Sequence, residues 1–194
     1  MKISTNVLAG VTGMTVLFAG NVSAHTFGAH GAGMAEGLVH PFIGIDHLLA
    51  MLAVGIWAAQ LGGRALWQVP LAFVSVMAGG AWLAQLGLDL SLVEVMIAAS
   101  VLVLGLLIAG SVRVSTSVSV MAVSVFALFH GYAHGLEMPQ AGAPLAYASG
   151  FMLATVCLLL IGIVLGLSLN RMRVLSRIGG AAIAVMGVYL LASL

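Results

Sequence analysis

Long apolar segments follow one another along most of the chain and are separated by very short connections. Most of these segments approach the roughly 20 residues that an α-helix needs to cross the hydrocarbon core of a bilayer. The pattern predicts six membrane-spanning helices, over residues 41–61, 66–86, 92–110, 114–134, 145–167 and 175–193. The expected fold class is therefore an all-α, polytopic membrane helix bundle.

The N-terminal residues follow a different pattern, which is typical of a cleavable signal peptide. Lys2 precedes an apolar stretch over residues 7–20, and Val22-Ser23-Ala24 has the small residues of a cleavage site. That stretch is shorter than a full span, so we expect removal of residues 1–24; an uncleaved first span is the alternative. Residues 25–39 would then form a short periplasmic segment, and residues 40–194 the six-helix transmembrane domain.

Composition supports a lipid bilayer as the environment of the chain. Apolar residues make up 62% of the sequence and charged residues only 6%, which excludes a soluble globular protein. The formal net charge of +1, without a basic stripe, argues against nucleic acid as a partner. The pattern does not distinguish a monomer from a homo-oligomer.

The charged residues are segregated between the two sets of connections, and this predicts the orientation. Arginines favour the cytoplasmic side of a membrane protein. Five arginines fall in alternate connections and four acidic residues fall at the opposite ends of the spans: Arg64, Arg113, Arg171, Arg173 and Arg177 against Glu36, Asp89, Glu94 and Glu137. We therefore expect a bacterial inner-membrane protein with both termini in the periplasm.

Two motifs place ionisable residues in or beside apolar spans, where such residues are functional candidates by default. They are HPFIGIDHLLAM, residues 40–51, and FHGYAHGLE, residues 129–137. In the predicted topology the first motif enters from the outside and the second leaves to the outside. Because a helix rises about 1.5 Å per residue, His47 and His130 both lie roughly 10 Å below the outer surface. The two motifs are therefore expected at a shared depth.

The spacing within each motif predicts a ladder of ligands on one helix face. His40, Gly44, His47 and Met51 follow the i, i+4, i+7, i+11 pattern, and His130, His134 and Glu137 follow a similar one. Imidazole with carboxylate suits nickel, cobalt or zinc, whereas calcium and magnesium need more oxygen ligands. A proton relay is the main competitor, because His/Asp/Glu chains also carry protons.

The remaining residues of the motifs have more than one reading. On an ideal helix Asp46 points about 120° from the His40–His47 face, so it would orient an imidazole unless Pro41 and Gly44 distort the helix and turn it inward. Pro41 suits the first position of a helix, so His40 is either a ligand or part of a helix start.

Met51, His25 and His30 are additional candidates for metal capture. The role of Glu137 is also left open. Met51 has the spacing of a soft ligand, but apolar packing is the favoured role. His25 and His30 either capture metal at the mouth or are solvated without a ligand role, which is the favoured reading. Glu137 is either a gate ligand or an ordinary interfacial carboxylate.

Two other functional classes compete with a metal permease. In an intramembrane zinc hydrolase three ligands would activate a water, yet no glutamate lies between His130 and His134 as in a zincin helix. A non-transporting metal sensor or maturation scaffold would bind metal without flux. No nucleotide-binding motif is present, so the chain itself does not hydrolyse ATP.

Three segments resemble the HupE/UreJ family of hydrogenase- and urease-associated membrane proteins: HPFIGIDHLLAMLAVGIWAAQLGGRALW, FHGYAHGLEMP and YASGFMLAT. HPFIGIDH is also similar to, but one residue longer than, the H-x4-D-H signature of nickel/cobalt transporters. The resemblance extends from about His25 to the C-terminus. It implies a nickel permease that supplies metalloenzyme maturation, with a cleavable signal peptide and no organic cofactor.

The resemblance also implies which residues act on the metal, with one departure from the family pattern. The implied functional residues are His40, Asp46, His47, His130, His134 and Glu137. Relatives often have a histidine a few residues after the Ala-Thr of the fifth span, where this chain has Val156-Cys157-Leu158-Leu159. If that histidine is a ligand in relatives, the site of this chain is altered.

Overall fold

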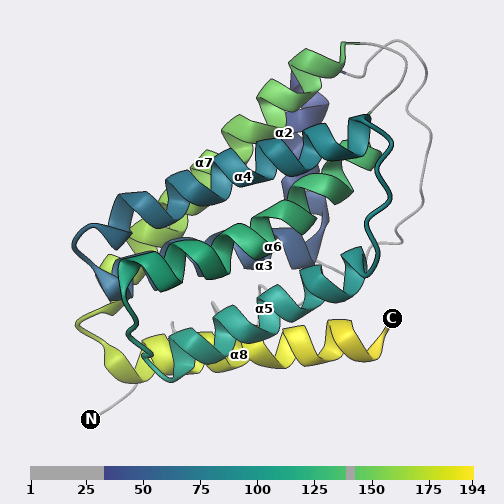
Figure 1. Cartoon of the computed structure of the whole chain (residues 1–194). Helices are drawn as coiled ribbons and strands as arrows, with labels where there is room; N and C mark the ends of the chain where they lie inside the picture. Colours follow the sequence, from purple (N-terminus) through teal and green to yellow (C-terminus); the bar gives the residue numbers. More distant parts are fainter. Residues whose placement is uncertain (1–32, 139–142) are drawn as a thin grey trace, which may run out of the picture.

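The computed structural model describes residues 33–138 and 143–194, and these residues form only helices (Figure 1). The order of the helices is α2 (Met34–Ile43), α3 (Ile45–Leu61), α4 (Ala65–Gln85), α5 (Val93–Ala109), α6 (Thr116–Leu136), α7 (Pro144–Leu169) and α8 (Arg173–Ala192). The all-helical fold class is confirmed for this part of the chain. The predicted signal peptide, residues 1–24, lies outside the described residues, as do His25 and His30.

Four of the helices are long and apolar enough to cross a membrane, namely α4, α6, α7 and α8. Helices α2 and α3 meet the same criterion only as a pair, and their axes are bent by 86°. Helix α5 is apolar but has only 17 residues. The fold thus contains four to five candidate membrane spans, and six full-length spans are not confirmed.

The span expected over residues 41–61 is not one continuous helix, because the chain leaves the helical conformation at Gly44, one of the two residues at which the sequence allowed a distortion. Gly44 is extended, with φ −81° and ψ 111°, and separates α2 from α3. A Cβ atom at this position would lie only 2.9 Å from Oδ1 of Asp46, so glycine at the break leaves room for the polar side chains behind it. Pro41 lies inside α2 rather than at its first position, and the segment expected as a lead-in is already helical from Met34.

The helices pack in pairs, with α4 on α6, α5 on α8, and α7 along both α2 and α3 (Figure 1). Small residues allow the backbones to approach closely, as is typical of membrane helices. A Cβ atom on Gly131 of α6 would collide with the backbone of Met77 in α4. The Gly162-x-x-x-Gly166 pair of α7 likewise faces α3, where Gly162 lies against Leu52 and Gly55.

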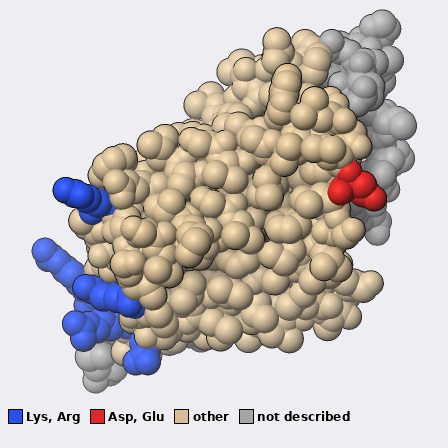
Figure 2. Space-filling model, viewed as in Figure 1, with Lys and Arg blue, Asp and Glu red and all other residues tan. Residues whose placement is uncertain are grey.

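The two ends of the bundle differ in charge. Figure 2 shows Lys and Arg at one end of the visible face and Asp and Glu at the opposite end. We call the end that carries Arg64, Arg113, Arg171, Arg173 and Arg177 the arginine end, and the end where α3 begins and α6 finishes the histidine end. Many large apolar side chains, such as Trp82 and Val164, are exposed on the sides between them. This distribution suits a protein surrounded by lipid.

Candidate metal-binding site

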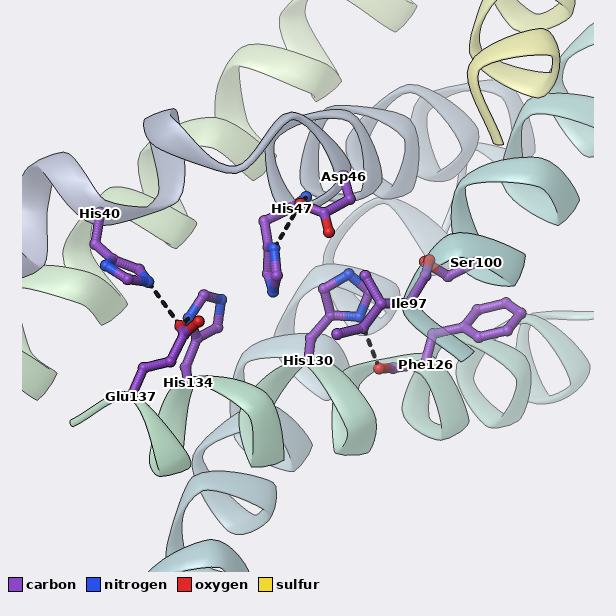
Figure 3. A network of polar contacts seen from close by, with 9 residues as sticks. All are labelled: His40, Asp46, His47, Ile97, Ser100, Phe126, His130, His134 and Glu137. Atoms are coloured by element: carbon purple, nitrogen blue, oxygen red, sulfur yellow. Dashed lines mark hydrogen bonds and ion pairs between the residues drawn. The ribbon is translucent and has the colours of Figure 1, made fainter. Parts of the chain in front are cut away.

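The two sequence motifs meet at the histidine end, and their imidazoles form one continuous row (Figure 3). His40 comes from α2, His47 from α3, and His130 and His134 from α6. The ring centroids are 5.1 Å apart for His40 and His134, 4.1 Å for His134 and His47, and 5.0 Å for His47 and His130. We call these four residues the histidine row. The break at Gly44 sets its order, because it directs His40 and His47 to different parts of α6.

The outer part of the row includes a carboxylate. Glu137, which directly follows α6, accepts a hydrogen bond of 2.9 Å from Nε2 of His40. Its carboxylate also lies 3.3 Å from Nδ1 of His134. One ligand atom from each of these three residues lies within 4.8 Å of the others, close enough to share a metal ion. We call His40, His134 and Glu137 the outer site.

Electrostatics keeps the Glu137 carboxylate ionised at neutral pH. The neighbouring imidazole of His134, and then the hydrogen bond from His40, hold the pKa of the Glu137 carboxyl well below its usual range. The side chain is about half exposed, so this negative charge is available at the mouth of the site. A cation that approaches the outer site therefore meets one negative charge and two imidazoles.

His47 is held by its neighbour Asp46. Oδ1 of Asp46 accepts one hydrogen bond from the backbone N–H of His47, at 2.7 Å, and one from its Nδ1, at 2.8 Å. A proton on Nδ1 leaves the lone pair on Nε2, which is the arrangement that prepares an imidazole for a metal. Nε2 of His47 is buried and has no hydrogen-bond partner in the described part of the chain. Asp46 thus contacts the row through His47.

His130 is prepared in the same way by the backbone of its own helix. Its Nδ1 donates to the carbonyl oxygen of Phe126 at 2.9 Å, which again leaves the lone pair on Nε2. The side chain is fully buried, and Nε2 has no partner among residues 33–138 and 143–194. The ring of Phe73 lies 5.8 Å from that of His130, so the inner end of the row is enclosed by apolar groups.

His134 joins the outer and inner parts of the row. It is buried, the ring of Phe151 lies 3.9 Å from its own, and neither ring nitrogen has a partner with hydrogen-bond geometry in the described residues. Across that part of the chain, six buried side-chain polar atoms lack a partner, and four of them belong to His47, His130 and His134. Such atoms each cost free energy, so their concentration here indicates a site that binds a ligand.

The comparisons with known proteins give the family of the chain. Residues 13–190 match the family described as HupE / UreJ protein. Protein HupE of Rhizobium leguminosarum bv. viciae is 48% identical over 168 residues, which cover 84% of this chain and 87% of that protein. The chain belongs to the HupE/UreJ family. No solved structure matches it.

Membership in the HupE/UreJ family excludes one of the alternatives. The family consists of membrane transport and accessory proteins of hydrogenase and urease that handle nickel or cobalt, and it is not a family of enzymes. The intramembrane hydrolase is therefore discarded. The outer site and the histidine row offer imidazole and carboxylate ligands, which suit these metals.

One buried polar residue of this HupE/UreJ member, Thr155, was not singled out from the sequence. Thr155 is fully buried on α7, one turn after Phe151, and its hydroxyl has no partner in the described residues. The only signal was a polar residue in an apolar span.

Met51 is fully buried in the apolar core, in agreement with a packing role. Leu159 contacts Gly55, eight residues beyond His47 on α3, so a histidine there would lie about 12 Å further along the helix.

Proposed function

We propose that this chain is a permease that admits a divalent metal ion, nickel first and cobalt second, into the cytoplasm for hydrogenase or urease maturation. The observation that supports it most strongly is the histidine row, which extends from beside the half-exposed carboxylate of Glu137 to the fully buried imidazole of His130. Two of its members have their tautomers set so that an unpartnered Nε2 faces the row. A row of imidazole ligands suits the passage of a divalent transition-metal ion.

The proposed orientation follows from the charge of the two ends. The arginine end faces the cytoplasm by the positive-inside rule, so the outer site opens to the periplasm and both chain termini lie on that side. Six crossings require α2 and α3 to act as one bent span and α5 to cross with 17 residues, a length of about 26 Å. The hydrocarbon core is about 30 Å thick, so the bilayer thins slightly beside α5.

In the proposed mechanism the ion loses its hydration in steps. It first exchanges water for His40, His134 and Glu137, and then moves to the Nε2 atoms of His47 and His130. Conduction needs several sites of moderate strength, because one very tight site would trap the ion. The ring spacings of 4.1–5.1 Å along the row suit transfer between neighbouring ligands. Helix motion at the glycine contacts would release the ion inward.

Influx of radioactive nickel into proteoliposomes tests this function. We expect His47→Ala and His130→Ala each to abolish influx, and cobalt to compete better than zinc. Ser119→Ala is the matched control, because Ser119 is equally buried on α6 but donates its hydroxyl to the carbonyl oxygen of Ser115. Normal influx in His130→Ala would contradict the pathway. Nickel binding without influx in the unaltered chain would favour a sensor or maturation scaffold.

A further inference from the structure

A polar cavity of about 580 Å³ lies at the arginine end, away from the histidine row. Its walls come from the last turn of α3, the connection between α5 and α6, and the junction of α7 and α8. Gln60 lies in its wall, 13 residues after His47 on α3, which corresponds to about 20 Å along the helix. The cavity is therefore distinct from the proposed metal site.

Three arginines line this cavity without a carboxylate partner. They are Arg113, Arg173 and Arg177. All five carboxylate side chains of the sequence, Glu36, Asp46, Asp89, Glu94 and Glu137, lie towards the histidine end. Among the described residues, each ion pair joins a carboxylate to a histidine, and none includes an arginine. The Nε of Arg177 donates to the carbonyl oxygen of Ala109 at 3.0 Å, which holds this guanidinium against the wall. The positive charge around the cavity is thus uncompensated by the described protein.

A buried amide adds a second indication of a ligand. Gln60 is 9% exposed, and its Nε2 donates to Oγ of Ser176 at 2.9 Å and to the carbonyl oxygen of Ile108 at 3.3 Å. Because a carbonyl oxygen only accepts, the orientation of the amide is determined. The Oε1 atom is buried and has no partner in the described part of the chain. Because Gln60 lines the cavity, this unsatisfied acceptor belongs to the cavity wall.

The start of α8 contributes a further positive element. Helix α8 begins at Arg173, and no side chain caps its N-terminus. The first N–H groups of a helix have no partner within it and favour a bound anion. Arg173, Ser176 and Arg177, all in the first two turns, line the cavity. Arginine side chains bind planar or tetrahedral oxyanions through paired hydrogen bonds.

We propose that this cavity binds a phosphate group whose parent molecule also carries a hydroxyl. The three guanidinium groups and the start of α8 hold the phosphate oxygens, and Oε1 of Gln60 accepts from the hydroxyl. Two sources have this chemistry: hydrogen phosphate from solution, and the headgroup of a glycerol-bearing anionic lipid. Basic cavities between membrane helices are known to take lipid headgroups. The volume lies within the range of small-molecule sites.

The purified full chain, in neutral detergent, allows a direct test. Binding of inorganic phosphate is measured by isothermal titration calorimetry, and retention of phosphatidylglycerol by native mass spectrometry. We expect Arg113→Gln and Arg173→Gln to weaken binding about tenfold, because hydrogen bonds to charged groups are the strong ones. Arg64→Gln and Arg171→Gln are matched controls, since both arginines belong to the same end but do not line the cavity; binding should stay within about twofold.

A second variant separates binding from folding. Arg173→Glu changes an exposed side chain of the cavity wall and reverses its charge, so it should abolish anion binding in a chain that remains monodisperse. Phosphate binding in calorimetry assigns the soluble source, and retention of phosphatidylglycerol alone assigns the lipid source; either supports the proposal. Binding of neither probe, or equal loss in Arg64→Gln and Arg171→Gln, would overturn it. None of these readouts depends on metal transport.

Discussion

The two ends of this helix bundle handle charge in opposite ways. At the histidine end, the side chains that face one another are imidazoles, three of them buried, with carboxylates only at the edge. At the arginine end, permanently charged side chains surround a cavity and remain exposed. The difference follows from desolvation, because burying a charged group inside a membrane protein is costly and an imidazole has a neutral form, whereas an exposed guanidinium keeps its charge at little cost.

Helix α3 connects the two ends and shows how sharply they are separated. It begins beside Asp46 and His47 and ends beside Gln60. The residues between them are almost all apolar, and Ala50, Ala53 and Val54 are fully buried. Among the described residues, no series of hydrogen-bonded side chains crosses this core. A change at one end should therefore leave ligand binding at the other end unaltered. The following variants test that separation.

The largest effect is expected from Asp46→Ala. This change removes the acceptor that sets the tautomer and direction of His47, and loss of such a partner weakens metal binding by about 10–100-fold. Nickel titration of the purified chain by calorimetry measures it, while phosphate binding at the arginine end should not change. Asp89→Ala is the control, because Asp89 is an exposed carboxylate at the same end. Unchanged nickel affinity in Asp46→Ala would contradict the role of this contact.

A smaller effect is expected from Gly44→Ala. The added Cβ would lie 2.9 Å from Oδ1 of Asp46 and 3.1 Å from Nδ1 of His47, so the pair must shift. We expect about tenfold weaker nickel binding, the lower end of the range for changes to a residue that orients a metal ligand. Gly79→Ala is a matched control, because a Cβ there meets nothing within 4 Å. A normal affinity in Gly44→Ala would show that the contact between Asp46 and His47 tolerates displacement.

The apolar middle of the bundle gives a test of stability rather than binding. Thr155 carries a buried hydroxyl without a partner in the described residues, and Thr155→Val removes that group with little change in shape. The variant should gain about 1 kcal/mol in stability, because an unsatisfied buried polar group is costly. Thermal unfolding in detergent measures this gain. Ser119→Ala, which breaks an existing hydrogen bond, should not be stabilised. Equal changes in the unfolding temperature of the two variants would contradict the conclusion that the Thr155 hydroxyl lacks a partner.

The smallest effect is expected from Glu137→Gln. The carboxylate is half exposed, so its attraction for a cation is screened by water and salt. The nickel concentration for half-maximal influx should rise about threefold, while the maximal rate stays close to that of the unaltered chain. Glu94→Gln, another exposed acidic residue at this end, is the control and should not change either quantity. A large fall in the maximal rate would instead assign Glu137 to the inner path.

The sequence by itself determined the class of the protein and the pairing of the two motifs. Apolar length predicts helices because an apolar segment of about 20 residues satisfies its own backbone groups inside a bilayer as a helix. The segregation of arginine and acidic residues predicts distinct ends, and Figure 2 shows that separation on one face of the folded chain. The shared depth of His47 and His130 also followed from helix rise and topology, and their rings are indeed neighbours.

Only the tertiary structure decided how these groups are arranged. A distortion at Pro41 and Gly44 was only one of two alternatives in the sequence, because helical periodicity describes a straight helix, whereas the extended backbone lies where Asp46 and His47 fill the space beside the glycine. The order of the row and the cavity beside Gln60 depend on how separate helices pack. Periodicity shows which residues share a face of one helix, but the neighbours of that face are set by close contacts between distant segments, such as Gly131 against Met77.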